Sequence, residues 1–129
     1  MRLCEENITL TGKAAALELL SIAHHEDLVE AVQDGDLHKL WHTNIPSAFE
    51  MRAEISRRLE LHRQGSMYPF ALKHLATQRC VGMTTYMNIE PSQRRLEIGS
   101  TWLRKSIQRS AVNTECKFLL LEYAFEHLN

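Results

Sequence analysis

The hydrophobic pattern of this sequence changes its period at Gly65, and this change constrains the fold more than any other feature. Before Gly65, apolar residues recur at i, i+3 and i+4 within residues 24–33, which is the spacing of a helix. After it, apolar and polar residues alternate in short runs as far as residue 103, which is the spacing of strands. A helical part followed by consecutive strands predicts an α+β fold with an antiparallel sheet.

The helix just before this change has recognisable end signals. Ser47 and Glu50 have the spacing of a capping box, and Gly65 is the usual residue type at a helix C-terminus. The sequence therefore predicts a helix over residues 47–65. Its apolar stripe is expected to contain Phe49, Met51, Ile55 and Leu59, with Arg57 and Arg58 on the solvated face.

The strands are predicted from alternation. Residues 68–72 and 81–87 are expected to form a hairpin with its turn at residues 76–79, and a third strand is expected over residues 95–103. Its side chains are expected to alternate, with Leu96, Ile98 and Trp102 on one face and Glu97, Gly99 and Thr101 on the other. Residues 10–22 fit either a short helix or a strand, because periodicity does not decide between them over so short a run.

The final element is predicted to be a helix that opens at residues 113–115 and follows a basic loop. Its buried stripe is expected to consist of Phe118, Leu121, Phe125 and Leu128, which recur at helical spacing.

Composition and cysteine spacing limit the setting of the chain. Its 129 residues are the length of one domain, and a net charge of -1 leaves no strong field for nucleic acid or an anionic membrane. Cys4, Cys80 and Cys116 stand far apart, which indicates a reducing, cytoplasmic setting rather than a disulfide framework. The longest purely apolar run, residues 118–121, is far shorter than the ~20 residues of a membrane span. We therefore expect a single cytoplasmic domain over residues 1–129, with neither nucleic acid nor a membrane as its partner.

The strand, loop and helix from residue 96 onward form the most informative unit. A short loop that leads into a helix N-terminus can bind an anion, because the first helical N–H groups lack partners and the helix dipole is positive there. Arg104, Lys105 and Arg109 add positive charge around this point. A phosphate-bearing ligand is one interpretation of this loop, and a solvated surface is the other.

Three segments of this unit resemble the GNAT superfamily of acetyl-CoA-dependent N-acetyltransferases. They are residues 96–103 (LEIGSTWL), 108–115 (QRSAVNTE) and 117–126 (KFLLLEYAFE). The resemblance is greatest to ribosomal-protein acetyltransferases of the RimJ/RimL type and extends over nearly the whole chain. It implies that residues 17–22 form a first strand, so that the antiparallel sheet has about four strands with helices on both faces.

The resemblance also implies where acetyl-CoA, the acetyl donor, would bind. The family's pyrophosphate loop corresponds to residues 108–113, which keep the opening glutamine but lack glycine. Asn113 is expected to take the place of glycine at the turn, since asparagine tolerates the left-handed conformation. The full predicted cofactor set is Gln108, Arg109, Ser110, Ala111, Val112, Asn113 and Thr114, with backbone groups of Thr101, Trp102 and Leu103 along the pantetheine arm.

The chemistry that the resemblance implies is direct attack of a primary amine, from a protein N-terminus or a small molecule, on the acetyl thioester. An amine with a pKa of ~10.4 for lysine or ~8 for a chain terminus must first lose a proton, which a general base can accept. Glu97 is the predicted base. The alternative is that Glu97 is a solvent-facing residue of an alternating strand.

Aromatic and histidine residues elsewhere receive structural interpretations. His38 and His42 stand at i and i+4, as zinc-binding pairs do, but no third ligand falls in register with them, and no metal is expected. Trp41 and Phe49 are expected to pack in the core or to line the acceptor groove.

The chain ends at Asn129, the last residue of the predicted final helix. The resemblance implies further strands and a helix after this point, so we expect a partial, truncated domain whose C-terminal strands are missing. The alternative function is a catalytically inactive acyl-CoA-binding or dimerising fragment. An unpaired edge strand favours association, which predicts a homodimer or a domain swap through the open sheet edge.

Overall fold

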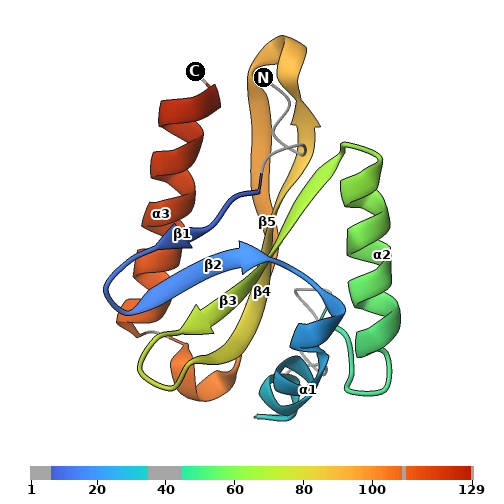
Figure 1. Ribbon diagram of the computed structural model, residues 1–129, viewed down its shortest axis with the longest axis vertical. Helices are drawn as coiled ribbons and strands as arrows, with labels where there is room; N and C mark the ends of the chain where they lie inside the picture. The colour runs from blue at the N-terminus through green and yellow to red at the C-terminus, as the bar shows by residue number, and fades with distance from the viewer. Residues whose placement is uncertain (1–6, 35–44, 109, 129) are drawn as a thin grey trace.

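The computed structural model describes residues 7–34, 45–108 and 110–128. One antiparallel sheet lies between α1 and α2 on one face and α3 on the other (Figure 1). The helices are α1 (His25–Gln33), α2 (Met51–Arg63) and α3 (Ala111–Leu128), and the strands are β1 (Leu10–Thr11), β2 (Ala15–Leu19), β3 (Met67–His74), β4 (Arg79–Glu90) and β5 (Arg95–Leu103). The predicted α+β class and the helices on both faces are confirmed.

The sheet is a meander in which each strand pairs with the next along the chain. The described residues contain five strands rather than about four, because Leu10–Thr11 adds a short strand beside β2. The ambiguous stretch at residues 10–22 is therefore mainly strand, although its last residues leave the sheet before α1. The predicted hairpin is confirmed, as is the third strand, which has the bounds Arg95–Leu103.

Each face of the sheet has its own buried core. The core toward α3 includes Leu17, Phe70, Leu72, Tyr86, Cys116 and Leu120, and the core toward α1 and α2 includes Leu28, Met51, Ile55, Cys80, Met83 and Trp102. The Tyr86 hydroxyl donates to the Leu120 carbonyl at 2.5 Å, which joins β4 to α3. Burial raises the pKa of Cys80 and Cys116 to about 12. Both thiols are thus protonated packing groups at neutral pH.

The ends of α2 follow the predicted signals. The Glu50 N–H donates to Ser47 Oγ at 3.2 Å and the Ser47 N–H donates to Glu50 Oε1 at 3.1 Å, which is the predicted capping box. Gly65 ends the helix with a φ of +83°, the left-handed conformation that glycine adopts without strain. Regular helix starts only at Met51, because residues 48–50 form a turn.

Two predictions for this helix are wrong. Phe49, expected in the apolar stripe and in the core or acceptor groove, is 97% exposed because it lies in the turn before the helix. Arg58, expected on the solvated face, is completely buried because it shares a helix face with Met51 and Ile55. Helix α2 therefore places a charged group against the sheet.

Glu54 joins Arg57 and Arg58 in a compact ion cluster. Its carboxylate accepts hydrogen bonds from Arg57 Nε and Nη2 and from Arg58 Nε, all at 2.8 Å. Burial acts to raise the pKa of Glu54, but these hydrogen bonds outweigh it and lower the pKa. The Nη1 and Nη2 atoms of Arg58 are buried without a hydrogen-bond partner in the described part of the chain. The cluster therefore contains a buried cation that is only partly paired.

Helix α3 begins earlier than predicted and buries a different face. It starts at Ala111, and its fully buried residues are Val112, Cys116 and Leu120. Asn113 therefore lies within the helix, and the prediction that it replaces glycine in a left-handed turn is wrong. The predicted stripe is wrong, since Phe118, Leu121 and Phe125 are 60%, 52% and 72% exposed; the side chain of Leu128 lies outside the described residues. Residues 118–121 are all apolar, so periodicity does not select one face of this helix.

Glu115 attaches the N-terminal strands to α3. Its Oε1 accepts hydrogen bonds from the backbone N–H groups of Ala14 and Ala15, both at 2.8 Å. Burial acts to raise the pKa of Glu115, but the backbone hydrogen bonds outweigh it and lower the pKa. The contact joins residues that lie at opposite ends of the sequence.

Acidic residues of α1 and its C-terminal end attach this helix to β4 and to the residue after β5. Arg79 pairs with Asp27 at 3.3 Å and with Glu30, and Arg104 pairs with Asp34 at 3.0 Å. Hydrogen bonding from Arg104 is the main cause of a lowered Asp34 pKa. These pairs fix α1 near the loop that leads into α3.

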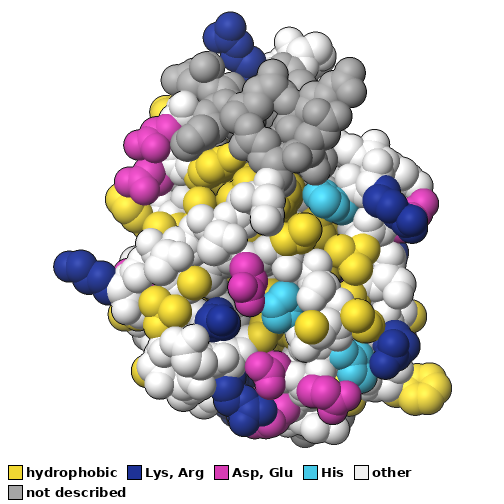
Figure 2. All heavy atoms as spheres, in the orientation of Figure 1, with side chains coloured by type: hydrophobic (Ala, Val, Ile, Leu, Met, Phe, Trp, Pro, Cys, Tyr) yellow, Lys and Arg dark blue, Asp and Glu magenta, His cyan; other side chains and the backbone are white. Residues whose placement is uncertain are grey.

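Figure 2 shows basic and acidic side chains interspersed over one face of the molecule. Within the described ranges, no helix is long and apolar enough to cross a membrane. The same ranges contain no group of three or more His, Cys, Asp or Glu residues that could hold a metal ion. Trp41, His38 and His42 lie outside the described residues.

Candidate active site

A β-bulge at Ser100 shapes the edge strand β5. Gly99 pairs with Thr85 and Trp102 pairs with Met83, so β5 contains one extra residue between these two pairs. Ser100 has a φ of +49°, in the left-handed region that non-glycine residues rarely adopt. Because of the extra residue, the side chains of β5 exchange faces beyond the bulge.

This exchange corrects the predicted faces of the strand. Ile98 and Thr101 were expected on opposite faces, yet they line the same pocket beside α3. Trp102 was expected on the same face as Ile98, yet it lies in the core toward α1 and α2. Simple alternation holds only where each residue of a strand has one partner in the neighbouring strand.

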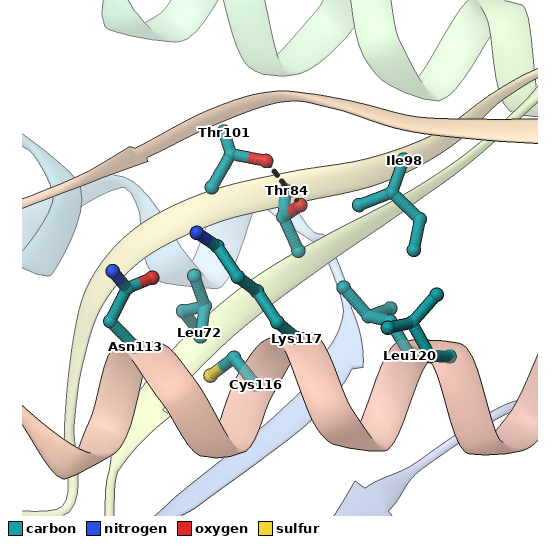
Figure 3. Close-up of a pocket in the computed structure, with 9 residues that line it drawn as sticks. Leu72, Thr84, Ile98, Thr101, Asn113, Cys116, Lys117 and Leu120 are labelled. Atoms are coloured by element: carbon teal, nitrogen blue, oxygen red, sulfur yellow. Dashed lines mark hydrogen bonds between the residues drawn. The ribbon is translucent and has the colours of Figure 1, made fainter.

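The pocket lies between α3 and the strands β3, β4 and β5 and has a volume of about 240 Å³. Figure 3 shows its lining residues, which are Leu72, Thr84, Ile98, Thr101, Asn113, Cys116, Lys117, Leu120 and Leu121. Helix α3 supplies one side of the pocket, and the sheet supplies the other (Figure 3).

Hydroxyl groups hold the bulge in place. The hydroxyl oxygens of Thr84 and Thr101 lie 2.7 Å apart. The Thr101 hydroxyl donates to the Gly99 carbonyl at 3.3 Å, and the buried Thr85 hydroxyl donates to the same carbonyl at 2.9 Å. Since Thr101 has only one hydroxyl proton, Thr84 is the donor to Thr101. The polar atoms of the sheet side of the pocket are thus already paired.

The remaining polar groups of the pocket come from the first turns of α3. Lys117 extends from the helix across the pocket toward Thr84 and Thr101, and Asn113 lies about one turn before it (Figure 3). Leu120 and Leu121 follow in the direction of the C-terminus. The helix therefore presents a polar end and an apolar end to the same pocket.

The loop before α3 is held by two side chains of the predicted cofactor set. Ser110 caps the helix, because its Oγ accepts a hydrogen bond from the Val112 N–H at 3.2 Å. Gln108 Nε2 donates to the Leu103 carbonyl at 2.9 Å. Ser110 and Gln108 thus shape the loop, while other N–H groups of the first helical turn lack intrahelical partners.

The basic residues of the loop contribute unequally to its charge. Arg104 is engaged by Asp34 at 3.0 Å and by Glu30 at 3.6 Å, so its charge is largely neutralised. Lys105 is exposed. Arg109 lies outside the described residues. Of the positive charge expected around this loop, the part from Arg104 is thus directed toward α1 and its C-terminal end.

The other predicted cofactor residues are spread around the pocket rather than gathered in it. The side chains of Trp102, Leu103 and Val112 are buried in the two cores, whereas Ala111 and Thr114 are exposed at the start of α3. The backbone is more informative, because the Arg104 N–H donates to the Val81 carbonyl of β4 at 2.8 Å. Strand alternation then directs the Leu103 N–H toward the outer edge of β5, which pairs with no strand in the described residues.

Glu97 lies on the other side of the sheet from this pocket. It is the neighbour of Ile98 before the bulge, so its side chain points to the face of β5 opposite α3. The side chain is exposed, and its Oε2 accepts a hydrogen bond from Asn88 Nδ2 at 2.7 Å. Glu97 is thus accessible to an acceptor that approaches the bulge from the face carrying α1 and α2.

Several pocket residues were missed in the sequence. Thr84 belongs to the predicted hairpin, but its role depends on the bulge opposite it, for which Gly99 within the strand pattern is the available signal. Lys117 stands four positions after Asn113, and this spacing on a helix is a signal that could have placed both on one face.

The meander sheet, the bulged edge strand and the capped helix together define an α+β domain with a pocket between the sheet and the first turns of α3. The family model described as the acetyltransferase (GNAT) domain matches residues 16–129. The chain therefore belongs to the GNAT acetyltransferase family. No curated protein matches the sequence.

Solved structures support the fold. A GCN5-related N-acetyltransferase from Brucella melitensis is 25% identical with a TM-score of 0.81, and the match covers 95% of this chain and 57% of that one. An acetyl transferase from Salmonella typhimurium that modifies the N-terminal serine of the 50S ribosomal subunit protein L7/L12 is 20% identical with a TM-score of 0.74, over 93% of this chain and 70% of that one. RimL in complex with coenzyme A is 20% identical with a TM-score of 0.73, and the match covers 94% of this chain and 70% of that one. The latter two show the fold alone, and the present chain spans little more than half the length of the Brucella protein.

Proposed function

We propose that this chain binds acetyl-CoA at the bulged edge of β5 and the start of α3, and that it transfers the acetyl group to a primary amine. The observation that carries this proposal is the bulge at Ser100 in β5, whose outer edge pairs with no strand in the described residues and which leads through a short loop to the N-terminus of α3. An extended thioester arm can bind such an edge as an added strand does. An anionic head group suits the helix N-terminus.

The predicted cofactor residues fit this arrangement in two groups. Outward backbone groups of residues 101–103 would bind the pantetheine arm, and the first N–H groups of α3 would bind the diphosphate. Hydrogen bonds from Gln108 and to Ser110 hold the loop in shape for that contact. Asn113 lines the end of the pocket nearest the N-terminus of α3.

The proposed reaction is direct acyl transfer. The amine nitrogen attacks the thioester carbonyl, the C–N bond forms and the C–S bond breaks, and CoA leaves as a thiolate that takes up a proton. Glu97 is proposed to remove the proton that the amine must lose. Its exposure on the face opposite the pocket supports this role. The acceptor is proposed to be a protein N-terminus or a small amine, in keeping with the substrate of the Salmonella protein.

Isothermal titration with CoA and acetyl-CoA tests the donor site. We expect both to bind, and we expect Asn113→Asp to weaken binding roughly tenfold because it adds a negative charge beside the anionic head group. Ser56→Asp adds the same charge at an exposed position of α2 and serves as the matched control. Absence of binding and of thermal stabilisation at millimolar acetyl-CoA would refute the donor site.

Release of CoA thiol in the presence of amines tests the transfer. With an acceptor peptide or a small amine, we expect Glu97→Gln to lower kcat roughly 100-fold without changing the affinity for acetyl-CoA. An unchanged kcat would mean that Glu97 is an ordinary surface residue. Binding without any thiol release would favour the alternative of a catalytically inactive acyl-CoA-binding domain.

The open edge of β5 also supports a proposal about assembly. In the part of the chain that the structure describes, β5 pairs with a strand on one side only, and such an edge favours pairing with a second copy. We propose a homodimer or a domain swap through this edge. Size-exclusion chromatography coupled to light scattering measures the molar mass in solution. A monomer at all concentrations would rule out the homodimer and the domain swap.

A further inference from the structure

We propose that the pocket between α3 and the bulge accepts the tail of an acyl-CoA longer than acetyl, with a chain of about six carbons. This inference rests on the proposed function, because it assumes that the thioester lies near the bulge. The pocket adjoins the bulge through Thr101, which lines it. It therefore offers space on the α3 side of the sheet, away from Glu97 and the face from which an amine would approach.

The size of the pocket exceeds what an acetyl group needs. Its volume is about 240 Å³, whereas an apolar cavity of roughly 150 Å³ is enough to hold benzene, a molecule of six carbons. An acetyl group ends in a single methyl group beyond the carbonyl carbon. Most of this space would remain empty in an acetyl-CoA complex.

The lining suits a hydrocarbon chain. Leu72, Ile98, Leu120 and Leu121 provide apolar surface from both sides of the pocket. The hydroxyls of Thr84 and Thr101 already bond to each other, and the Thr101 hydroxyl also donates to the Gly99 carbonyl. An entering chain would therefore leave no hydroxyl of the sheet without a partner.

The order of residues along α3 gives the chain a direction. Asn113 and Lys117 stand nearer the helix N-terminus, where an anionic head group is favoured, and Leu121 stands farther along. The distance from Asn113 to Leu121 along the helix axis is about 12 Å at 1.5 Å per residue. A molecule with an anionic head and an apolar tail matches this order.

The same order predicts discrimination between acyl groups of equal length. A butyryl chain would place a methyl group near Leu120 and Leu121, whereas a succinyl chain would place a carboxylate there. Burying a carboxylate among leucines is costly, and the Lys117 ammonium points toward Thr84 and Thr101 rather than toward Leu120 (Figure 3). The pocket is therefore expected to select apolar tails.

Titration with CoA, acetyl-CoA, butyryl-CoA, hexanoyl-CoA and succinyl-CoA tests the proposal. We expect affinity to rise about fourfold for each added methylene from acetyl to hexanoyl, and succinyl-CoA to bind more weakly than butyryl-CoA. Equal affinities for acetyl-CoA and hexanoyl-CoA would overturn the inference and leave the proposed function intact. Failure of CoA and all its thioesters to bind would overturn both.

A pocket-filling variant distinguishes binding of the acyl chain in this pocket from non-specific hydrophobic binding elsewhere on the surface. Leu121→Trp enlarges a half-exposed residue that lines the pocket, and Phe125→Trp makes a similar change one turn later, outside the pocket. We expect Leu121→Trp to abolish the gain from acetyl-CoA to hexanoyl-CoA while acetyl-CoA binding is retained. Phe125→Trp should keep the full gain. If both variants keep the gain, the acyl chain binds elsewhere and the inference is wrong.

Discussion

Thr84 on β4 and Thr101 on β5 share a hydrogen bond of 2.7 Å across the bulge. The bond exists only because the extra residue at Ser100 turns Thr101 toward the face of Thr84. Ile98 points the same way, so the bulge also creates the sheet side of the pocket. One residue in the left-handed conformation thus determines which side chains β5 presents to the pocket.

The threonine pair should show the asymmetry of a buried hydrogen bond. Thr84→Val removes one partner and is expected to lower the free energy of unfolding by about 1 kcal/mol. The double change Thr84→Val with Thr101→Val removes both hydroxyls and should cost less than the sum of the two single changes. Urea unfolding of the four proteins in a double-mutant cycle measures this. Additive costs would show that the hydroxyls do not interact in solution.

Gly82 is expected to be intolerant of any side chain. A Cβ at this position would lie 2.2 Å from the Trp102 carbonyl oxygen and 3.0 Å from Leu103 Cα, both of which are backbone atoms. Gly82→Ala should therefore destabilise the fold by about 3 kcal/mol as β4 and β5 are forced apart.

Gly99→Ala is the matched comparison for this change. Its Cβ would meet mainly the flexible end of Met87, at 2.6 Å from the sulfur, so the cost should be clearly smaller. Thermal unfolding followed by circular dichroism compares the two variants. Equal losses would mean that the close approach of the backbones at Gly82 is not what limits substitution.

Acid should weaken the attachment of α1. Arg104 lowers the pKa of Asp34 in the folded state, so this carboxylate contributes stability above its unfolded pKa of ~3.9, and the contribution is lost as pH falls through the folded pKa. We expect Asp34→Asn to have a lower free energy of unfolding than the parent protein at pH 7. The difference between the two proteins should disappear below pH 4. Urea unfolding at a series of pH values tests this, and a gap that stays constant down to acid pH would contradict it.

Arg58 and Glu54 should respond in opposite ways to substitution. Arg58 is completely buried, and two of its nitrogens have no hydrogen-bond partner among the described residues. Arg58→Met is therefore expected to be neutral or stabilising, because a buried partly paired ion is replaced by an apolar side chain of similar length. Glu54→Ala leaves the Arg58 charge without its partner and should cost about 3 kcal/mol. Unfolding free energies of both variants decide between this view and one in which the cluster stabilises the fold as a whole.

Local signals predicted the ends of elements well. Ser47 and Glu50 form the expected capping box, and the bounds of β5 agree with the alternating run after the turn at residues 91–93. The buried faces of the helices were harder to predict, because they depend on which elements pack against each helix. Residues 118–121 of α3 are apolar on every side, and Arg58 is charged yet buried. In both cases tertiary packing overrides the pattern.

The candidate site was predicted only in part. Thr101 and Asn113 come together at one pocket, and Ser110 caps the helix at the expected loop. Thr84 and Lys117 were missed, because the pocket depends on how three strands and a helix meet. Gly99, an isolated glycine within the strand pattern, is a signal for the bulge, although strict alternation ignores it and the left-handed residue is the serine that follows.

The hydrogen bonds between Glu115 and the amides of Ala14 and Ala15 have a consequence for how the molecule is made. They join positions 100 and 101 residues apart, and synthesis proceeds from the N-terminus. Ala14 and Ala15 therefore receive this anchor only after about another hundred residues have been synthesised. Until then β1 and β2 lack their attachment to α3, and contacts over such a separation in sequence form slowly.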